Sequence, residues 1–76
     1  MTLKEFNELE PFKQYDLVFT QGDFLEYRID DPKRYALYSL FMFFVEIEYN
    51  RLDNKIIGLV SFEEGKLLYK YSFFRK

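Results

Sequence analysis

The chain has no cysteine and no histidine among its 76 residues, which removes much of the common chemistry of enzyme sites. Without cysteine it can form no disulfide, thiolate metal site or thiol nucleophile, and without histidine it lacks the commonest metal ligand and general base. Tryptophan is also absent, and only three glycines and two prolines occur. The stability of the single domain, residues 1–76, must come from burying aliphatic and aromatic side chains or from association.

Long apolar runs are missing as well. No run approaches the roughly 18 residues that a membrane span requires, and the N-terminal segment, residues 1–8, is polar and amphipathic. These features, together with the lack of cysteine, predict a protein of a reducing, cytoplasmic compartment that does not associate with membranes.

The remaining polar residues do not assemble a recognisable catalytic motif. Glu46 and Glu48 stand two residues apart on a predicted strand, about 7 Å between side chains, but so small a sheet has no cleft to hold a sugar between them. Residues 64–66 have the acid-x-lysine spacing of some metal-dependent nucleases without the second acidic strand position. A glycine-rich phosphate loop is absent. We therefore predict a protein that is not an enzyme and uses no cofactor or metal.

The first third of the chain has helical periodicity. Thr2 and Glu5 fit a capping box, in which each side chain accepts a hydrogen bond from the other residue's backbone amide. Apolar residues then recur every three or four positions, interrupted by a proline that suits the first turn of a new helix. This pattern predicts helices over about residues 2–9 and 11–21, with Gly22 as a left-handed terminator.

After Gly22 the apolar period changes to two, which is typical of strands. The predicted strands cover about residues 24–30, 34–40, 43–49, 55–62 and 66–74. A tight turn is expected near residues 39–42, because an uninterrupted strand from Tyr35 to Tyr49 would be unusually long. The fold class is therefore α+β, with two short N-terminal helices packed on one face of a four- or five-stranded antiparallel meander.

The segment from Tyr35 to Tyr49 concentrates aromatic residues in a chain that is already 22% aromatic. Strand alternation assigns alternate residues from Phe43 to Tyr49 to the core and Phe44, Glu46 and Glu48 to the opposite face. Aromatic rings among charges on that face are typical of interface centres. The predicted protein-binding residues are Tyr38, Phe44, Glu46, Glu48, Lys70, Phe74, Asp23, Asp30 and Asp31.

Two alternatives for this face stay open. Glu46 and Glu48 opposite Lys55 or Lys70 would form ordinary cross-strand ion pairs on a solvated surface. A homodimer that buries the aromatic face would equally account for the exposed rings. The sequence does not separate a self-interface from an interface with another protein.

Charge is distributed unevenly although the net charge is only −2. Residues 1–31 carry eight acidic and three basic side chains, whereas residues 32–76 carry eight basic and five acidic ones. The C-terminal segment, residues 66–76, interleaves four bases with four aromatic rings, a texture found in proteins that bind single-stranded nucleic acid. A small RNA- or DNA-binding regulator is therefore the alternative function, although the sequence pI near 5.1 favours a protein partner.

A resemblance to known proteins rests on five segments of the chain, residues 3–9, 14–18, 37–49, 55–57 and 61–62. Together they resemble a group of small uncharacterised bacterial proteins, several of which travel with mobile elements, and this resemblance implies no activity. The chain is also similar in size, charge and surface character to anti-CRISPR inhibitors, which occupy a nuclease surface. That resemblance implies a non-enzymatic module that inhibits a larger nucleic-acid-handling protein, such as a nuclease or its ribonucleoprotein complex.

Overall fold

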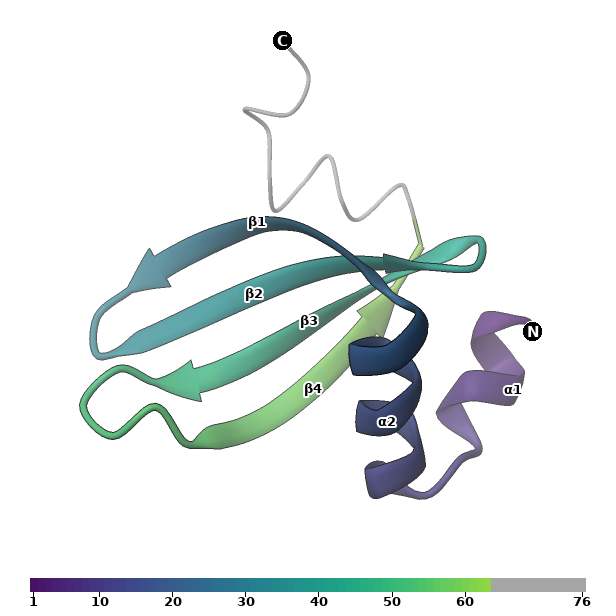
Figure 1. Cartoon of the computed structure of the whole chain (residues 1–76), viewed down its shortest axis with the longest axis horizontal. Coiled ribbons are helices and arrows are strands. Elements are labelled where there is room, and N and C mark those ends of the chain that lie inside the picture. The colour runs from purple at the N-terminus through teal and green to yellow at the C-terminus, as the bar shows by residue number, and fades with distance from the viewer. Residues whose placement is uncertain (64–76) are drawn as a thin grey trace, which may run out of the picture.

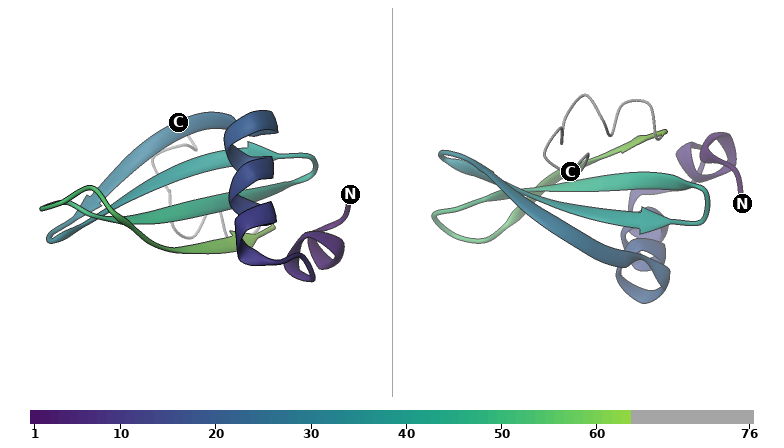
Figure 2. Two further views of the ribbon diagram at one scale, coloured as in Figure 1. Left: turned by 60° about the horizontal axis from the view of Figure 1, so that its bottom comes forward. Right: turned by 90° about the horizontal axis from the view of Figure 1, so that it is seen from above.

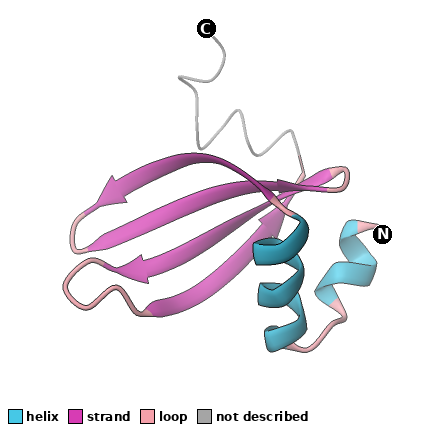
Figure 3. Ribbon diagram, viewed as in Figure 1, coloured by secondary structure: helices cyan, strands magenta, loops and turns pink. Residues whose placement is uncertain are grey.

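The computed structural model describes residues 1–63. Two helices precede four strands (Figure 3), and the elements are α1 (Leu3–Asn7), α2 (Pro11–Gln21), β1 (Asp23–Asp30), β2 (Lys33–Leu40), β3 (Phe43–Asn50) and β4 (Ile56–Phe62). The strands form one antiparallel sheet in the order β1-β2-β3-β4, so each strand pairs with its neighbour in the chain. The predicted α+β meander is confirmed. The predicted fifth strand, residues 66–74, lies outside the described residues.

Helix α1 begins with the predicted capping box. The Thr2 Oγ1 atom accepts a hydrogen bond from the Glu5 amide at 3.1 Å, and the Glu5 Oε1 atom accepts one from the Thr2 amide at 2.8 Å. The hydrogen bond from the Thr2 amide to the carboxylate holds the pKa of Glu5 below its usual value. The helix ends at Asn7, two residues earlier than predicted, and α2 begins at Pro11.

Gly22 ends α2, but the predicted left-handed conformation is wrong. Its φ of −78° and ψ of 153° are extended, so the chain passes directly from the helix into β1. Glycine is needed here for a different reason, because a Cβ atom would lie only 2.6 Å from the carbonyl oxygen of Val18.

Both helices lie on the same face of the sheet (Figures 1 and 2), and the core fills the space between the helices and the sheet. The buried cluster comprises Phe6, Val18, Ala36, Leu40, Phe43, Val45 and Ile47. The rings of Phe6 and Phe43 lie 5.2 Å apart, and the Gln14 side chain donates a hydrogen bond to the Phe6 carbonyl at 2.9 Å. The predicted core positions of β3 are thus confirmed for three residues, and Tyr49 is half-buried beside them.

The turn expected near residues 39–42 consists of Phe41 and Met42. Phe41 has a φ of 54°, a left-handed conformation that bulky side chains rarely adopt. Both residues are exposed, and the Met42 side chain projects almost wholly into solvent.

Helix α2 crosses the strands near one end of the sheet, and the sheet continues beyond it toward the β1–β2 and β3–β4 turns (Figure 2). We call the part beneath the helices the covered half of this face and the part beyond them the open half. Within the described part of the chain, neither helix has the length and apolarity needed to cross a membrane.

Candidate protein-binding surface

The predicted outer-face residues of β3 do lie on the face away from the helices. Phe44, Glu46 and Glu48 are paired with Ser39, Leu37 and Tyr35 of β2, and the alternate residues of both strands point to the core. Leu37 and Phe62 are buried in a second apolar cluster on this outer face, and Phe44 packs against them. The Phe44 and Phe62 rings stack at 6.1 Å.

The two glutamates of β3 are already paired within the chain. Glu46 is only 3% exposed, and its Oε2 atom lies 3.2 Å from Nη2 of Arg28. Glu48 lies 2.9 Å from the Lys33 amine, and this hydrogen-bonded contact raises the pKa of Lys33. Both carboxylates therefore form ion pairs with basic side chains of the same chain, whereas the sequence predicts that they contact a partner protein.

Tyr38 does not join the outer face, which corrects the expectation from the sequence. It is paired with Val45, a core residue, and its ring makes edge contacts with Phe19 of α2 at 5.9 Å and Phe24 of β1 at 5.7 Å. The register of β2 places Leu37 and Ser39 on the outer face, so the residue between them must face the helices.

The predicted acidic residues lie at the ends of β1. Asp23 begins the strand, whereas Asp30 and Asp31 lie at the β1–β2 turn, where Asp31 forms an ion pair with Arg51. The other two predicted contact residues, Lys70 and Phe74, lie outside the described residues. Of the seven predicted residues within positions 1–63, the structure brings the three β3 residues together on one patch.

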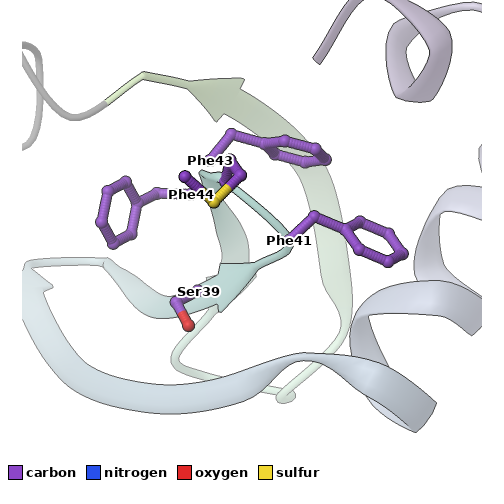
Figure 4. Close-up of a pocket in the computed structure, with 5 residues that line it drawn as sticks. Ser39, Phe41, Phe43 and Phe44 are labelled. Carbon is purple, nitrogen blue, oxygen red and sulfur yellow. The ribbon is translucent and has the colours of Figure 1, made fainter. Parts of the chain in front are cut away.

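A shallow hollow of 290 Å³ lies at the β2–β3 turn (Figure 4). Ser39, Phe41, Met42, Phe43 and Phe44 line it. The Phe41 and Phe44 rings point to opposite sides of the turn, so they do not enclose a ligand between them. Its residues supply one hydroxyl and no ionisable side chain, which suits an apolar contact better than a reaction.

The largest departure from expectation is on the open half. Tyr27, Ile29 and Ile56 are 53%, 59% and 42% exposed, although the β2 and β3 residues paired with them belong to the helix-side face that carries the core. The register puts Ile29 beside Arg34, and Arg34 beside Tyr49, which is paired with Ile56. We call these five residues the tyrosine–arginine surface.

Arg34 lies at the centre of this surface. Its guanidinium carbon is 4.9 Å from the ring centroid of Tyr27 and 4.9 Å from that of Tyr49, which is the geometry of cation–π contacts. Its Nε atom is buried without a hydrogen-bond partner. Burial raises the pKa of Tyr49, and the positive charge of Arg34 partly opposes this rise. The Tyr49 hydroxyl therefore stays protonated at neutral pH.

The sequence contained a signal for this surface that we did not use. Arg34 is in phase with Ala36, Tyr38 and Leu40, so alternation places a charged side chain on the apolar face of β2. A cation on an otherwise apolar strand face requires a partner or a ring to contact it.

Residues 1–63 contain no group of three acidic side chains that could hold a metal ion. No family model, curated protein or solved structure matches the chain. What the sequence resemblance implies about mobile elements and anti-CRISPR inhibitors therefore stays a prediction.

Proposed function

We propose that this chain is a non-enzymatic protein-binding module that inhibits or modulates a larger protein by occupying part of its surface. The observation that carries the proposal is the tyrosine–arginine surface, where Tyr27 and Ile29 of β1 and Ile56 of β4 are exposed on the same face of the sheet, with Arg34 and Tyr49 between them. Exposed apolar groups of this kind are characteristic of protein contact sites.

The residue types on this surface also support a protein partner. Tyrosine and arginine are enriched at the centres of interfaces, because a ring or a guanidinium supplies contact area together with hydrogen-bonding groups. The hydrogen-bonded strands hold these side chains on a preformed surface. Binding would therefore cost little conformational entropy in the backbone.

The class of partner that we propose is a nucleic-acid-handling protein, such as a nuclease or its ribonucleoprotein complex, and an anti-CRISPR or anti-defence role is its most concrete version. Exposed carboxylates support this choice, because Asp23 and Asp30 lie on the edge strand β1 within the acidic first third of the chain. Acidic side chains match the basic grooves with which such enzymes hold nucleic acid.

Affinity capture with matched variants tests the proposal. Tagged wild-type protein, Ile29→Asp and Leu52→Asp would each be incubated with extract of the native cell, and the retained proteins identified. Leu52 is a suitable control because it is 88% exposed in the β3–β4 turn and is not one of the five residues of the tyrosine–arginine surface. We expect one partner to be retained by wild type and Leu52→Asp and lost by Ile29→Asp. Equal retention by all three proteins would contradict the proposed surface.

Two measurements on the isolated protein address the alternatives. Tight binding of labelled RNA or DNA that weakens steeply with salt would favour a nucleic-acid regulator over an inhibitor. Light scattering that gives twice the chain mass for wild type but not for Ile29→Asp would assign the open half to a homodimer. We expect a monomer that binds nucleic acid weakly.

A further inference from the structure

We infer that the tyrosine–arginine surface binds a protein segment that presents one aspartate or glutamate carboxylate to Arg34, between apolar side chains that contact Ile29 and Ile56. The inference rests on the proposed protein-binding function and specifies the chemistry of the partner at that site.

The first step is the pairing of the cations in the described part of the chain. It contains three arginines, and two of them have carboxylate partners, since Arg28 pairs with Glu46 and Arg51 pairs with Asp31. Lys33, next to Arg34 in sequence, pairs with Glu48. Arg34 has no ion pair with any of residues 1–63, although its side chain is half-buried and its Nε atom is fully buried.

The second step is the orientation of the guanidinium. The Tyr27 and Tyr49 rings contact it at equal distances and restrict its movement. Ring contacts of this kind stabilise the charge but leave the N–H groups, which point along the guanidinium plane, in need of acceptors. A carboxylate is the acceptor that best fits this planar fork, because two parallel hydrogen bonds form at once.

The third step concerns the groups around the arginine. Ile29 pairs with Arg34 in the register, and Ile56 lies on the other side of Arg34, beyond Tyr49. Both isoleucines are exposed, so an occupant gains most by placing apolar side chains on both sides of its carboxylate. A nucleic-acid strand fits this environment poorly. It would bring several phosphates to a surface that has one cation, Arg34, among its five residues.

A second copy of the chain fits poorly as well. A two-fold dimer joined through the centre of this surface would bring the two Arg34 side chains toward each other, and like charges at a desolvated interface are destabilising. The unpaired cation is thus matched by an acidic group from a different protein.

The test is a titration of the uniformly ¹⁵N-labelled full chain, followed by NMR, with a terminally blocked tripeptide Leu-Glu-Leu. The matched control peptide is Leu-Gln-Leu, which has the same shape without the charge. We expect the glutamate peptide to shift the Arg34 Nε–H signal and the backbone amides of Tyr27 and Ile29. The glutamine peptide should bind at least about tenfold more weakly, because a hydrogen bond to a charged group is stronger than one between neutral groups.

Three variants connect this difference to Arg34. Arg34→Met retains an unbranched apolar side chain and should abolish the preference for the glutamate peptide. Arg34→Lys keeps the positive charge without the planar guanidinium and should retain part of the preference for the glutamate peptide. Arg51→Met removes an arginine in the β3–β4 turn and should leave the preference unchanged. An Arg51→Met effect equal to that of Arg34→Met would overturn the assignment.

The outcomes separate this inference from the proposed function. Equal affinity for the two peptides would reject the carboxylate site, and the proposed function would still stand if Ile29→Asp abolished capture of the partner. Both would fail if Ile29→Asp also retained that partner. The inference would likewise be overturned if a twelve-residue oligo-thymidylate bound more tightly than the glutamate peptide, or if protein concentration alone shifted these signals, as self-association would.

Discussion

The two halves of the helix-side face of the sheet are built by the same strands but have different surroundings. In the covered half, Phe6 and Val18 from the helices pack on Val45, and none of the three is exposed. In the open half, Tyr27 and Ile29 are more than half exposed. Alternation along the strands is therefore not what separates core from surface on this face.

The difference follows from the dimensions of the elements. A helix that crosses strands covers a length close to its own diameter, about 10 Å, whereas an eight-residue strand extends for roughly 26 Å. Helix α2 crosses the strands in this way (Figure 2), and α1 is only five residues long. Two such helices leave part of the face uncovered, and in this chain the uncovered part is apolar around Arg34 rather than polar.

The comparison predicts a large difference in stability between paired substitutions. Phe6→Ala should lower the free energy of unfolding by about 3–5 kcal/mol, because it removes a buried ring that contacts Phe43. Ile29→Ala should change it by less than about 1 kcal/mol, since the side chain is largely exposed. Urea unfolding followed by circular dichroism would measure both. Similar losses for the two variants would show that the open half is part of the core.

The two glycines of the described chain provide a second matched pair. Gly22→Ala should destabilise the protein by about 1–3 kcal/mol, because the new Cβ atom would clash with the Val18 carbonyl oxygen at the end of α2. Gly58→Ala on β4 should have little effect or stabilise by up to about 1 kcal/mol, since its Cβ would meet no atom within 4 Å. Thermal unfolding of both variants would decide, and equal melting temperatures would contradict the close approach at Gly22.

Local patterns in the sequence were sufficient to predict the elements within residues 1–63 and their order. The capping box at Thr2, the proline at position 11 and the turn at Phe41 are each encoded within a few residues, and each is confirmed. The conformation of Gly22 was not predictable in this way. Its extended backbone leads directly into β1, where a Cβ atom would also lie 3.4 Å from the carbonyl oxygen of Ser39, and that contact joins segments distant in the sequence.

Which side chains of a strand point toward the helices was harder to predict, because this depends on how the strand pairs with its neighbours. Strand β2 has apolar residues in both phases, Leu37 in one and Tyr38 in the other, so alternation alone does not determine which phase meets the helices. In β1 the register shifts between Phe24 and Glu26, which changes the facing that simple alternation predicts for Leu25. The surface around Arg34 was missed because its exposure depends on where α2 crosses the sheet.

A smaller effect is expected from Arg34 itself. Arg34→Met should lower the free energy of unfolding by about 1–2 kcal/mol, because it removes cation–π contacts with Tyr27 and Tyr49. Arg51→Met, which removes only an exposed ion pair with Asp31, should cost less than about 1 kcal/mol. Chemical denaturation of the two variants would measure the difference. An unchanged stability in Arg34→Met would mean that the rings do not hold the guanidinium.

The smallest predicted effect is a pH dependence shared by the two halves. Burial raises the pKa of Tyr38, beneath α2, and of Tyr49, in the open half, while the charge of Arg34 lowers both. A tyrosine whose folded pKa exceeds its unfolded value, about 10, stabilises the fold fully below that value, and this contribution is lost as pH rises through the folded pKa. Stability should therefore fall above about pH 10, and less steeply in Tyr38→Phe and Tyr49→Phe than in wild type.

Titration of the tyrosine hydroxyls distinguishes the two halves, because the charge of Arg34 acts on their pKa values. Arg34→Met removes the charge that lowers the pKa of Tyr49, so spectrophotometric titration should show tyrosine ionisation moving to higher pH. In a Tyr49→Phe background the shift should shrink to the part contributed by Tyr38. Lys33 also titrates in this range with a raised pKa, but it is present in every variant and cancels in the differences. A shift of full size without Tyr49 would place the influence of Arg34 in the covered half instead.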